Sequence, residues 1–286
     1  MRVDDTQVQR DRSGLMPVAI PVAVSGFGSV GKTLARRLLA GIPGFELVAI
    51  GSRDPERTRR QVEEALRCDV PVLDSRVLNG CAKILLECAP AVAFRGIAEP
   101  ALIAGMTVVT ISAAALLDNL DLEDIAARGK GRIVLASGAI AGLDAIKAAR
   151  LDKITSVRMI TRKPPQSLAR TSWMQSRNID ARTMTDAVCV FSGTARDAAR
   201  QFPANANVAA AVSLAGAGPD LTMVEIWADP AVERNTHSVY LDSDAARIEV
   251  KIANFPSADN PATSRIAALS MLATLISLTC PLSIGT

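Results

Sequence analysis

Two features of the sequence have residue types and spacing suited to redox chemistry: the only histidine, His237, and the glycine-rich stretch Gly26-Phe27-Gly28-Ser29-Val30-Gly31. Imidazole is the one side chain whose ordinary pKa lies near neutrality, so His237 is the first candidate for a general acid or base. A Gly-x-Gly-x-x-Gly stretch between a strand and a helix is typical of a dinucleotide site. We therefore expect hydride transfer to a bound dinucleotide, with His237 moving the accompanying proton.

Each glycine of the stretch has a physical role in such a site. Gly26 permits the tight turn, Gly28 lets a pyrophosphate approach the backbone, and Gly31 allows close contact between helix and sheet. The backbone at Ser29 and Val30 opens the helix, where free N–H groups and the positive dipole end attract phosphates. The alternative is a glycine-rich turn in an α/β domain that binds no ligand.

The end of the second predicted strand indicates which dinucleotide is preferred. A site for NAD usually has an acidic residue there, which binds the ribose hydroxyls, whereas this chain has Ser52 and Arg53. A hydroxyl and a guanidinium suit a 2′-phosphate, so we expect NADP to be preferred and NAD to be possible. The alternative is that Arg53 belongs to a solvated face. Ala89, directly after the third predicted strand, is also assigned to the cofactor site.

The elements that must position these residues alternate between strand and helix in the first half. Continuous aliphatic runs, typical of strands buried on both faces, predict strands at 20–25, 45–50, 84–88, 106–111 and 132–135. Helices are predicted at 30–40, 54–66, 92–104 and 121–127. This order predicts an α/β fold with an N-terminal Rossmann domain, a doubly wound parallel sheet, over residues 18–150.

The second half has a different pattern. Strands are expected at 221–228, 238–242 and 246–253, the last with Ile248, Val250 and Ile252 on one face, and helices at 194–201 and 208–215. This pattern predicts a C-terminal α+β domain on a mostly antiparallel sheet at 151–262. An apolar helix within 263–286 is expected to pack back on the Rossmann domain or into an interface, and residues 1–17 to form a flexible extension.

Composition excludes several classes of protein. The 286 residues carry a net charge of +3 with Lys and Arg scattered along the chain, which does not fit a nucleic-acid partner. No apolar stretch is long enough to span a membrane. Five cysteines without a Cys-x-x-Cys pair favour a reduced, cytoplasmic protein with neither a disulfide framework nor a metal site. The apolar C-terminal helix and sheet face indicate a homodimer or a higher homo-oligomer.

Six further strings, read together, carry a family resemblance. They are Ser137-Gly138-Ala139-Ile140-Ala141-Gly142-Leu143-Asp144, Thr161-Arg162-Lys163-Pro164-Pro165, Phe202-Pro203-Ala204-Asn205-Ala206-Asn207-Val208, Ala228-Asp229-Pro230, Arg234-Asn235-Thr236-His237 and Asn260-Pro261-Ala262-Thr263-Ser264. Their order and spacing resemble the L-aspartate dehydrogenase family from about residue 18 to the C-terminus.

The resemblance implies a reaction and places residues in it. The reaction is the NAD(P)-dependent, reversible conversion of L-aspartate to iminoaspartate, which yields oxaloacetate and ammonia. The family's catalytic histidine corresponds to His237, and its cofactor-contacting residues to Ala141 and Asn207, with Asn205 as an alternative register for the latter. The product would supply NAD biosynthesis, or the enzyme would act in aspartate and nitrogen metabolism.

The substrate carboxylates need donors and positive charge. Lys163, Asn207, Thr263 and Ser264 are the candidates. Each has a plainer interpretation: Lys163 as a solvent-exposed residue before two prolines, Thr263 and Ser264 as caps of the last helix, and the asparagines as caps of the helix at 208–215.

Two rival functions remain. One is a related two-domain reductase acting on another small acid, such as a homoserine dehydrogenase or dihydrodipicolinate reductase, although only the glycine turn resembles those families. The other is a catalytically silent NAD(P)-binding module. Its best support is the string Ser112-Ala113-Ala114-Ala115-Leu116-Leu117-Asp118, where the family often has Ser-Val-Gly-Ala-Leu-Ala-Asp and where we expect a loop beneath the nicotinamide.

Overall fold

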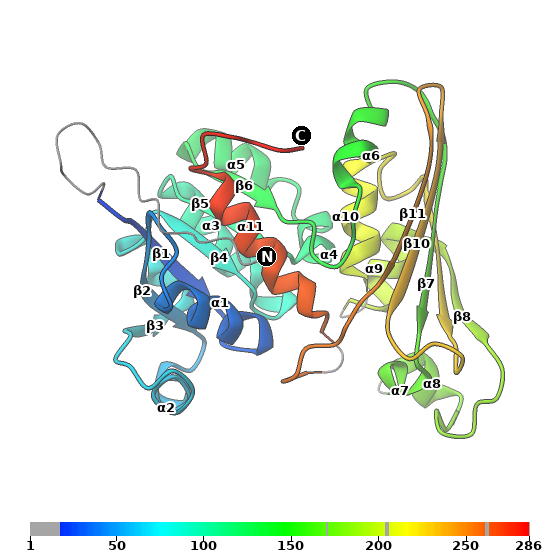
Figure 1. The fold of residues 1–286 in the computed structure, drawn as a ribbon, viewed down its shortest axis with the longest axis horizontal. Coiled ribbons are helices and arrows are strands. Elements are labelled where there is room, and N and C mark those ends of the chain that lie inside the picture. Colours follow the sequence, from blue (N-terminus) through cyan, green and yellow to red (C-terminus); the bar gives the residue numbers. More distant parts are fainter. Residues whose placement is uncertain (1–17, 170, 204–205, 261–262, 286) are drawn as a thin grey trace, which may run out of the picture.

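The fold has two lobes, each built on one β-sheet (Figure 1). The computed structural model describes residues 18–285 except 170, 204–205 and 261–262. The predicted flexible extension at 1–17 and the alternative cofactor residue Asn205 therefore lie outside the described residues.

The first lobe contains a six-stranded parallel sheet in the order β3-β2-β1-β4-β5-β6. The strands are β1 (Ile20–Ser25), β2 (Phe45–Ser52), β3 (Val72–Asp74), β4 (Ile84–Glu87), β5 (Thr107–Thr110) and β6 (Arg132–Leu135). The order reverses between β1 and β4, and ligands of doubly wound sheets bind at such a switch point, beyond the carboxyl ends of the strands. The predicted Rossmann sheet is confirmed, with β3 added at its edge.

Helices cover both faces of this sheet. They are α1 (Ser29–Leu39), α2 (Pro55–Leu66), α3 (Phe94–Ile103), α4 (Ala113–Leu117) and α5 (Leu122–Gly129), with short 3₁₀ turns η1 (Ser75–Gly80) and η2 (Ala91–Ala93). One core lies between the sheet, α3 and α5, with Leu85, Phe94 and Leu102 fully buried. The other contains Val22, Val24 and Leu34, from β1 and α1.

The last helix, α11 (Arg265–Ser277), completes this second core. Its Met271 and Leu275 are fully buried in the same cluster as Val22 and Leu34, although more than 200 residues separate them in the chain. The C-terminal segment therefore leaves the second lobe and returns to the first, where it lies beside α1 (Figure 1).

The second lobe is built on a five-stranded sheet in the order β11-β10-β7-β9-β8. The strands are β7 (Ile154–Lys163), β8 (Val188–Thr194), β9 (Thr222–Ala228), β10 (Thr236–Ser243) and β11 (Arg247–Ala253). Every pair is antiparallel except β7 with β9, so the predicted mostly antiparallel sheet is confirmed. Ile248, Val250 and Ile252 alternate with exposed residues, as period-two patterning predicted.

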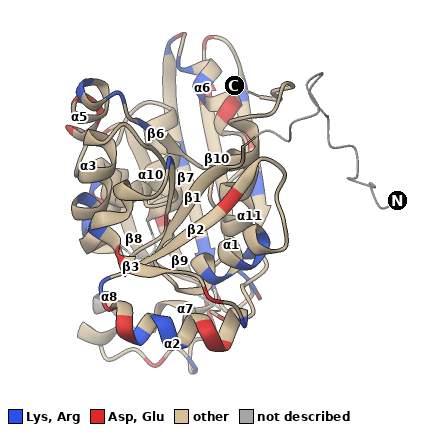
Figure 2. Cartoon of the chain, turned by 90° about the vertical axis from the view of Figure 1, so that its left-hand side faces the viewer, with Lys and Arg blue, Asp and Glu red and all other residues tan. Residues whose placement is uncertain are grey.

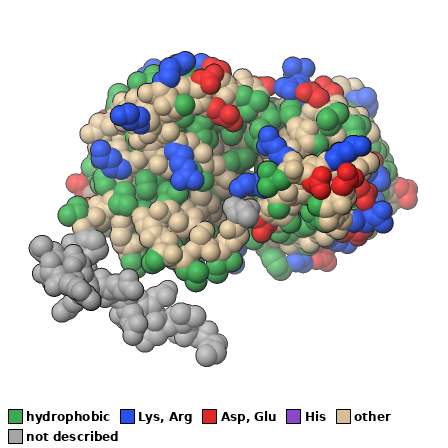
Figure 3. Space-filling view, turned by 90° about the horizontal axis from the view of Figure 1, so that it is seen from above, with side chains coloured by type: hydrophobic (Ala, Val, Ile, Leu, Met, Phe, Trp, Pro, Cys, Tyr) green, Lys and Arg blue, Asp and Glu red, His purple; other side chains and the backbone are tan. Residues whose placement is uncertain are grey.

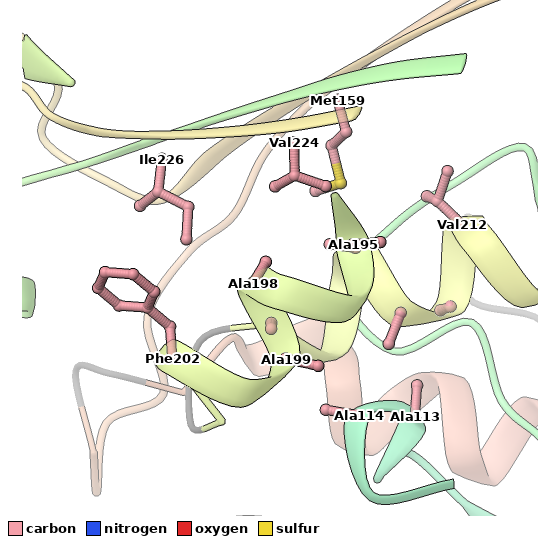
Figure 4. Close-up of a cluster of buried hydrophobic side chains, with 14 of the residues drawn as sticks. Ala113, Ala114, Met159, Ala195, Ala198, Ala199, Phe202, Val212, Val224 and Ile226 are labelled. Carbon is pink, nitrogen blue, oxygen red and sulfur yellow. The ribbon is translucent and has the colours of Figure 1, made fainter. Parts of the chain in front are cut away.

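Helices cover one face of the second sheet and separate it from the first lobe (Figure 1). They are α6 (Leu143–Ala149), α9 (Ala195–Gln201) and α10 (Asn207–Ala215), while the short helices α7 (Pro165–Leu168) and α8 (Ser172–Ser176) follow β7. Figure 4 shows Met159, Val224 and Ile226 pointing from the strands toward alanines of α9, such as Ala195 and Ala198. Small side chains on the helix let it lie close to the sheet.

In the two views that colour charge, positive and negative side chains are mixed. Lys and Arg alternate with Asp and Glu on α2 (Figure 2), and both signs are interspersed on the face drawn in Figure 3. Among the described residues, no helix has the length and apolar character needed to cross a membrane. Within the same part of the chain, no group of three or more His, Cys, Asp or Glu side chains is placed to hold a metal ion.

Candidate active site

A cavity of about 220 Å³ lies where the two lobes meet, beyond the carboxyl ends of the parallel strands. Among the predicted site residues, its lining contains Val30, Ala89, Lys163, Asn207, His237, Thr263 and Ser264. Segments of both lobes and the start of α11 therefore build one site, and all four predicted substrate ligands lie in it together with the only histidine. The predicted residues outside its lining are Gly26, Gly28, Ser29, Gly31, Ser52, Arg53 and Ala141.

The glycine turn has the geometry that a dinucleotide requires. Gly26 has φ +94°, a left-handed conformation, and a Cβ there would come within 2.8 Å of the Cys88 carbonyl oxygen. A Cβ at Gly31 would overlap the Gly26 carbonyl, whereas a Cβ at Gly28 would meet no protein atom within 4 Å. Gly26 and Gly31 thus hold the turn against the sheet, and Gly28 leaves the space in front of the α1 N-terminus open. These residues fit a dinucleotide pyrophosphate.

The hydroxyl of Ser29 lies 2.6 Å from that of Ser257, in the segment that leads back from β11 to α11. This contact brings the returning chain against the cofactor turn. The start of α1 is therefore fixed by both lobes rather than by the Rossmann sheet alone.

The end of β2 presents a serine and an arginine, as the sequence indicated. Ser52 is the last residue of β2, and its hydroxyl lies 2.7 Å from that of Thr58. Arg53 is exposed beside it. The nearest acid in sequence, Asp54, caps α2, because its carboxylate accepts a hydrogen bond from the Arg57 N–H.

Glu87, at the end of β4, is a fully buried residue that sequence reasoning missed. Its carboxyl group accepts hydrogen bonds from the Ala89 N–H (2.8 Å) and the Thr110 hydroxyl (2.7 Å). Thr110 in turn accepts from the Ser112 N–H. Burial raises the pKa of Glu87, and the donors oppose that rise. The network fixes Ala89 and Ser112, which both line the cavity.

His237 lies on β10, an interior strand of the second sheet, and is 3% exposed. A lone histidine after a loop is more often an exposed or strand-edge residue, but His237 is neither, and no histidine is visible on the face drawn in Figure 3. Its Nδ1 lies 3.0 Å from the hydroxyl of Thr161 on β7. Burial and the nearby charge of Lys163 lower the pKa of His237 from 6.5 to about 3. The imidazole is therefore neutral at physiological pH, with Nδ1 engaged.

Lys163 ends β7 and is 5% exposed, so it is not the solvent-exposed residue of the alternative interpretation. Burial lowers its pKa from 10.5 to about 8. A cation that lines a cavity at this depth is well suited to an anionic ligand, because its attraction is weakly screened by water.

Asn207 is the first residue of α10, and its side chain does not cap that helix. Its Oδ1 accepts a hydrogen bond of 3.0 Å from the Ala114 N–H, at the start of α4. The residues expected to form a loop beneath the nicotinamide are therefore a buried helix, Ala113–Leu117, tied to the second lobe. The altered string thus has an ordered, buried structure that contacts Asn207.

Ser264 precedes α11 but does not cap it with its side chain, so the proposed capping role is wrong for this hydroxyl. Within the described part of the chain, two buried side-chain polar atoms have no hydrogen-bond partner: Ser264 Oγ and Asn235 Oδ1. Both residues line the cavity. Buried polar atoms left without protein partners are a common sign of a ligand site.

The string 137–144 contributes to the cavity through Ser137, Gly138 and Ala139, whereas Ala141 is exposed outside it. Gly138 is tied to the last helix, since its N–H donates to the Ser270 hydroxyl at 3.0 Å. Cys88, Ser112 and Asn235 also line the cavity, although none of them was assigned to the site. Ser112 and Asn235 stand in strings that the sequence analysis singled out, and Cys88 directly follows β4, so the strings and the strand ends are the signals that could have indicated them.

Comparison with known proteins finds one family model for each half of the chain. Residues 26–136 match the family model "Homoserine dehydrogenase, NAD binding domain", and residues 144–278 match "Aspartate dehydrogenase, C-terminal". An L-aspartate dehydrogenase of Bradyrhizobium diazoefficiens is 44% identical over 265 residues, 93% of this chain and 94% of that protein. L-aspartate dehydrogenase 3 of Bordetella bronchiseptica is 44% identical over 93% of this chain and 97% of its own length.

Solved structures agree with this relationship. The aspartate dehydrogenase of Thermotoga maritima has a TM-score of 0.71 at 27% identity and covers 93% of this chain and 99% of its own. A hyperthermophilic archaeal homoserine dehydrogenase in complex with NADPH has a TM-score of 0.56 at 14% identity, over 94% of this chain and all of that one, and shares the fold alone. With 44% identity over nearly the whole chain, this protein belongs to the L-aspartate dehydrogenase family.

Proposed function

We infer that this protein is an NAD(P)-dependent L-aspartate dehydrogenase, which interconverts L-aspartate with iminoaspartate and hence with oxaloacetate and ammonia. The observation that carries this function is a cavity whose lining includes the start of α1, a buried neutral histidine and a buried lysine. A nicotinamide ring bound there supplies the hydride acceptor or donor at the substrate Cα. The glycine turn and the N–H groups of α1 would hold its pyrophosphate.

His237 is the acid/base of the proposed mechanism. A neutral imidazole can accept a proton from the substrate amine as the Cα–H bond breaks, or from the water that hydrolyses the imine. Because Thr161 engages Nδ1, Nε2 is the ring nitrogen assigned to this transfer. The contact holds the ring plane, and for Nε2 to accept a proton, Nδ1 must carry the hydrogen and donate it to the Thr161 hydroxyl.

Lys163 and Ser264 would bind the two substrate carboxylates, with Thr263 and Asn207 beside them. Lys163 provides charge, and Ser264 provides a hydroxyl at the N-terminus of α11, where the helix dipole also favours an anion. The proposal is supported by the free hydroxyl of Ser264, which a helix cap would have engaged.

The proposed function is tested by initial rates with oxaloacetate, ammonium and NADPH or NADH. We expect the wild-type protein to oxidise the cofactor and His237→Ala to lose about 10²- to 10⁴-fold in kcat, the usual contribution of a general acid or base. A folded wild-type protein that binds NADPH but gives no rate would instead favour the silent module. A rate with homoserine but none with aspartate would favour the related reductase.

NADP is proposed as the preferred cofactor because Arg53 is exposed at the end of β2 while Asp54 is occupied as a helix cap. Replacing Arg53 by Ala should raise KM for NADPH by about 10-fold, the contribution of one charged hydrogen bond. KM for NADH, which lacks the 2′-phosphate, should change little. Equal changes in both constants would place Arg53 on a merely solvated face.

A homodimer is proposed through the open face of the second sheet. Met223 and Tyr240 are 46% and 39% exposed there, in register with each other across β7. Covering such apolar side chains is a common reason for self-association. Light scattering on the wild type and on Met223→Lys should show a dimer and a shift toward monomer; a wild-type monomer at micromolar concentration would contradict the proposal.

A further inference from the structure

Asn235 stands out among the cavity residues because its side-chain oxygen is buried without a partner although its backbone is firmly held. The Asn254 N–H donates to the Asn235 carbonyl at 2.8 Å. The Asn254 side chain, in a residue only 4% exposed, donates to the Ala139 carbonyl at 2.9 Å. The backbone of Asn235 is thus held by Asn254, which also ties it to the 137–139 turn, and the buried side-chain oxygen extends from this held backbone.

A second cavity, also of about 220 Å³, meets the first at this point. Asn235 and Ser264 line both cavities, and the second is otherwise built from residues that include Arg234, Asn254 and Gln166. The two unpartnered atoms therefore lie where the two spaces adjoin. A ligand that fills the first cavity reaches Asn235 on one side and the start of α11 on the other.

The chemistry of the two atoms differs. An amide oxygen is an acceptor and is satisfied only by a donor, whereas a serine hydroxyl at a helix N-terminus can donate to an anion. Lys163 is a further donor in the same lining, and His237, two residues beyond Asn235, is held neutral. The site therefore offers an acceptor that needs an N–H or O–H donor, Asn235 Oδ1, and donors that need an acceptor, the Ser264 hydroxyl and Lys163. A zwitterionic amino acid offers both.

We propose that Asn235 binds the amino nitrogen of the substrate, accepting a hydrogen bond through Oδ1, and so holds ammonia or the amine beside His237. This proposal rests on the proposed function. It makes Asn235 a specificity-determining residue for the nitrogen-bearing reactants, because the keto group of oxaloacetate has no hydrogen to donate to the amide oxygen.

The test is a set of steady-state measurements on the full-length chain in the direction of amination. For Asn235→Ala we expect KM for ammonium to rise about 10- to 100-fold, the value of a hydrogen bond to a charged group. KM for oxaloacetate should stay within about twofold, because that substrate does not use the lost contact. Asn235→Asp keeps the acceptor and adds a negative charge, so KM for ammonium should be no higher than the wild-type value, while the charge repels oxaloacetate and raises its KM.

Ser264→Ala should show the opposite pattern to Asn235→Ala. We expect its KM for oxaloacetate to rise and its KM for ammonium to stay unchanged. Asn79→Ala, at an exposed position of η1, is the surface control. NADPH fluorescence titrations and circular dichroism establish that each variant is folded and binds cofactor. If Asn235→Ala shifts both KM values equally, or leaves that for ammonium unchanged, Asn235 has only a structural role and the proposal is wrong. If the wild type gives no rate, the function itself fails.

Discussion

The most direct physical test of the site concerns the protonation of His237. As the only histidine of the chain, it gives a single imidazole signal in a spectrum of ¹³C-histidine-labelled, tag-free protein. Because burial and Lys163 lower its pKa to about 3, we expect this signal to keep the chemical shift of a neutral ring from pH 8 down to pH 5. An unperturbed histidine would titrate near 6.5.

The same shift has a consequence for stability whose sign can be worked out. In the unfolded chain the imidazole of His237 is protonated below pH 6.5, whereas in the native state it stays neutral down to about pH 3. The free energy of unfolding therefore decreases as the pH falls through this window. Each pH unit corresponds to about 1.4 kcal/mol, and the loss from pH 6.5 to 5 is therefore about 2 kcal/mol. His237→Gln should remove this pH-dependent contribution. The difference in urea-unfolding free energy between wild type and His237→Gln should therefore change by about 2 kcal/mol between pH 7 and 5.

A midpoint of 6 to 7 for the imidazole signal, or a pH-independent difference between wild type and His237→Gln, would refute this account of the site. Comparing the two proteins cancels the titration of carboxyl groups such as Glu87. Lys163→Met provides the second arm, since removing the neighbouring charge should raise the pKa of His237 while leaving the ring buried.

Three further outcomes follow from the same geometry. Between pH 7 and 9 the KM for oxaloacetate should rise about 10-fold, because Lys163 loses its proton in this range. Lys163→Met should abolish this pH dependence. Initial rates measured across the range check both expectations. Gly31→Ala should lower the melting temperature and abolish NADPH binding, because its methyl group would overlap the Gly26 carbonyl. Gly28→Ala should keep the melting temperature and weaken only NADPH binding, because its methyl group meets no protein atom. Equal melting temperatures for the two variants would contradict the geometry of the turn. Met271→Ala should lower the unfolding free energy by about 2 to 5 kcal/mol, because Met271 is fully buried. Leu269→Ala, at a half-exposed position of the same helix, should lower it by less than about 0.5 kcal/mol. Equal losses for the two variants in chemical denaturation would contradict the packing of α11.

The parallel sheet could be predicted because strands buried on both faces leave continuous aliphatic runs between amphipathic helices. The short edge strand β3 could not, since three residues after Pro71 carry no periodic signal. Strand β8 was also missed: it lies at the edge of its sheet, and a register shift between Cys189 and Phe191 interrupts its alternation.

The candidate site was predictable where a motif or the family resemblance named residues, as at the glycine turn and His237. The burial of Lys163 was not, because lysine is rarely buried and its depth depends on how far β7 runs toward the first lobe. Glu87 was missed, and Asn235 was named in a string but assigned no role, because a single sequence does not show which residues the fold brings together. Their importance comes from neighbours 19 and 23 residues or more away in sequence, such as Asn254 and Thr110, which only the fold brings into contact.

The return of α11 to the first sheet has a consequence for how the protein is made. Because Met271, Leu272 and Leu275 pack in the core beneath β1 together with α1, the nucleotide-binding lobe cannot bury that face completely until residues 265–277 have left the ribosome. Domains usually fold as units in the order of synthesis, but here a lobe that begins with β1 is completed by a helix that is translated after the second lobe. We therefore expect the nascent chain to expose part of an apolar sheet face until that helix has been made.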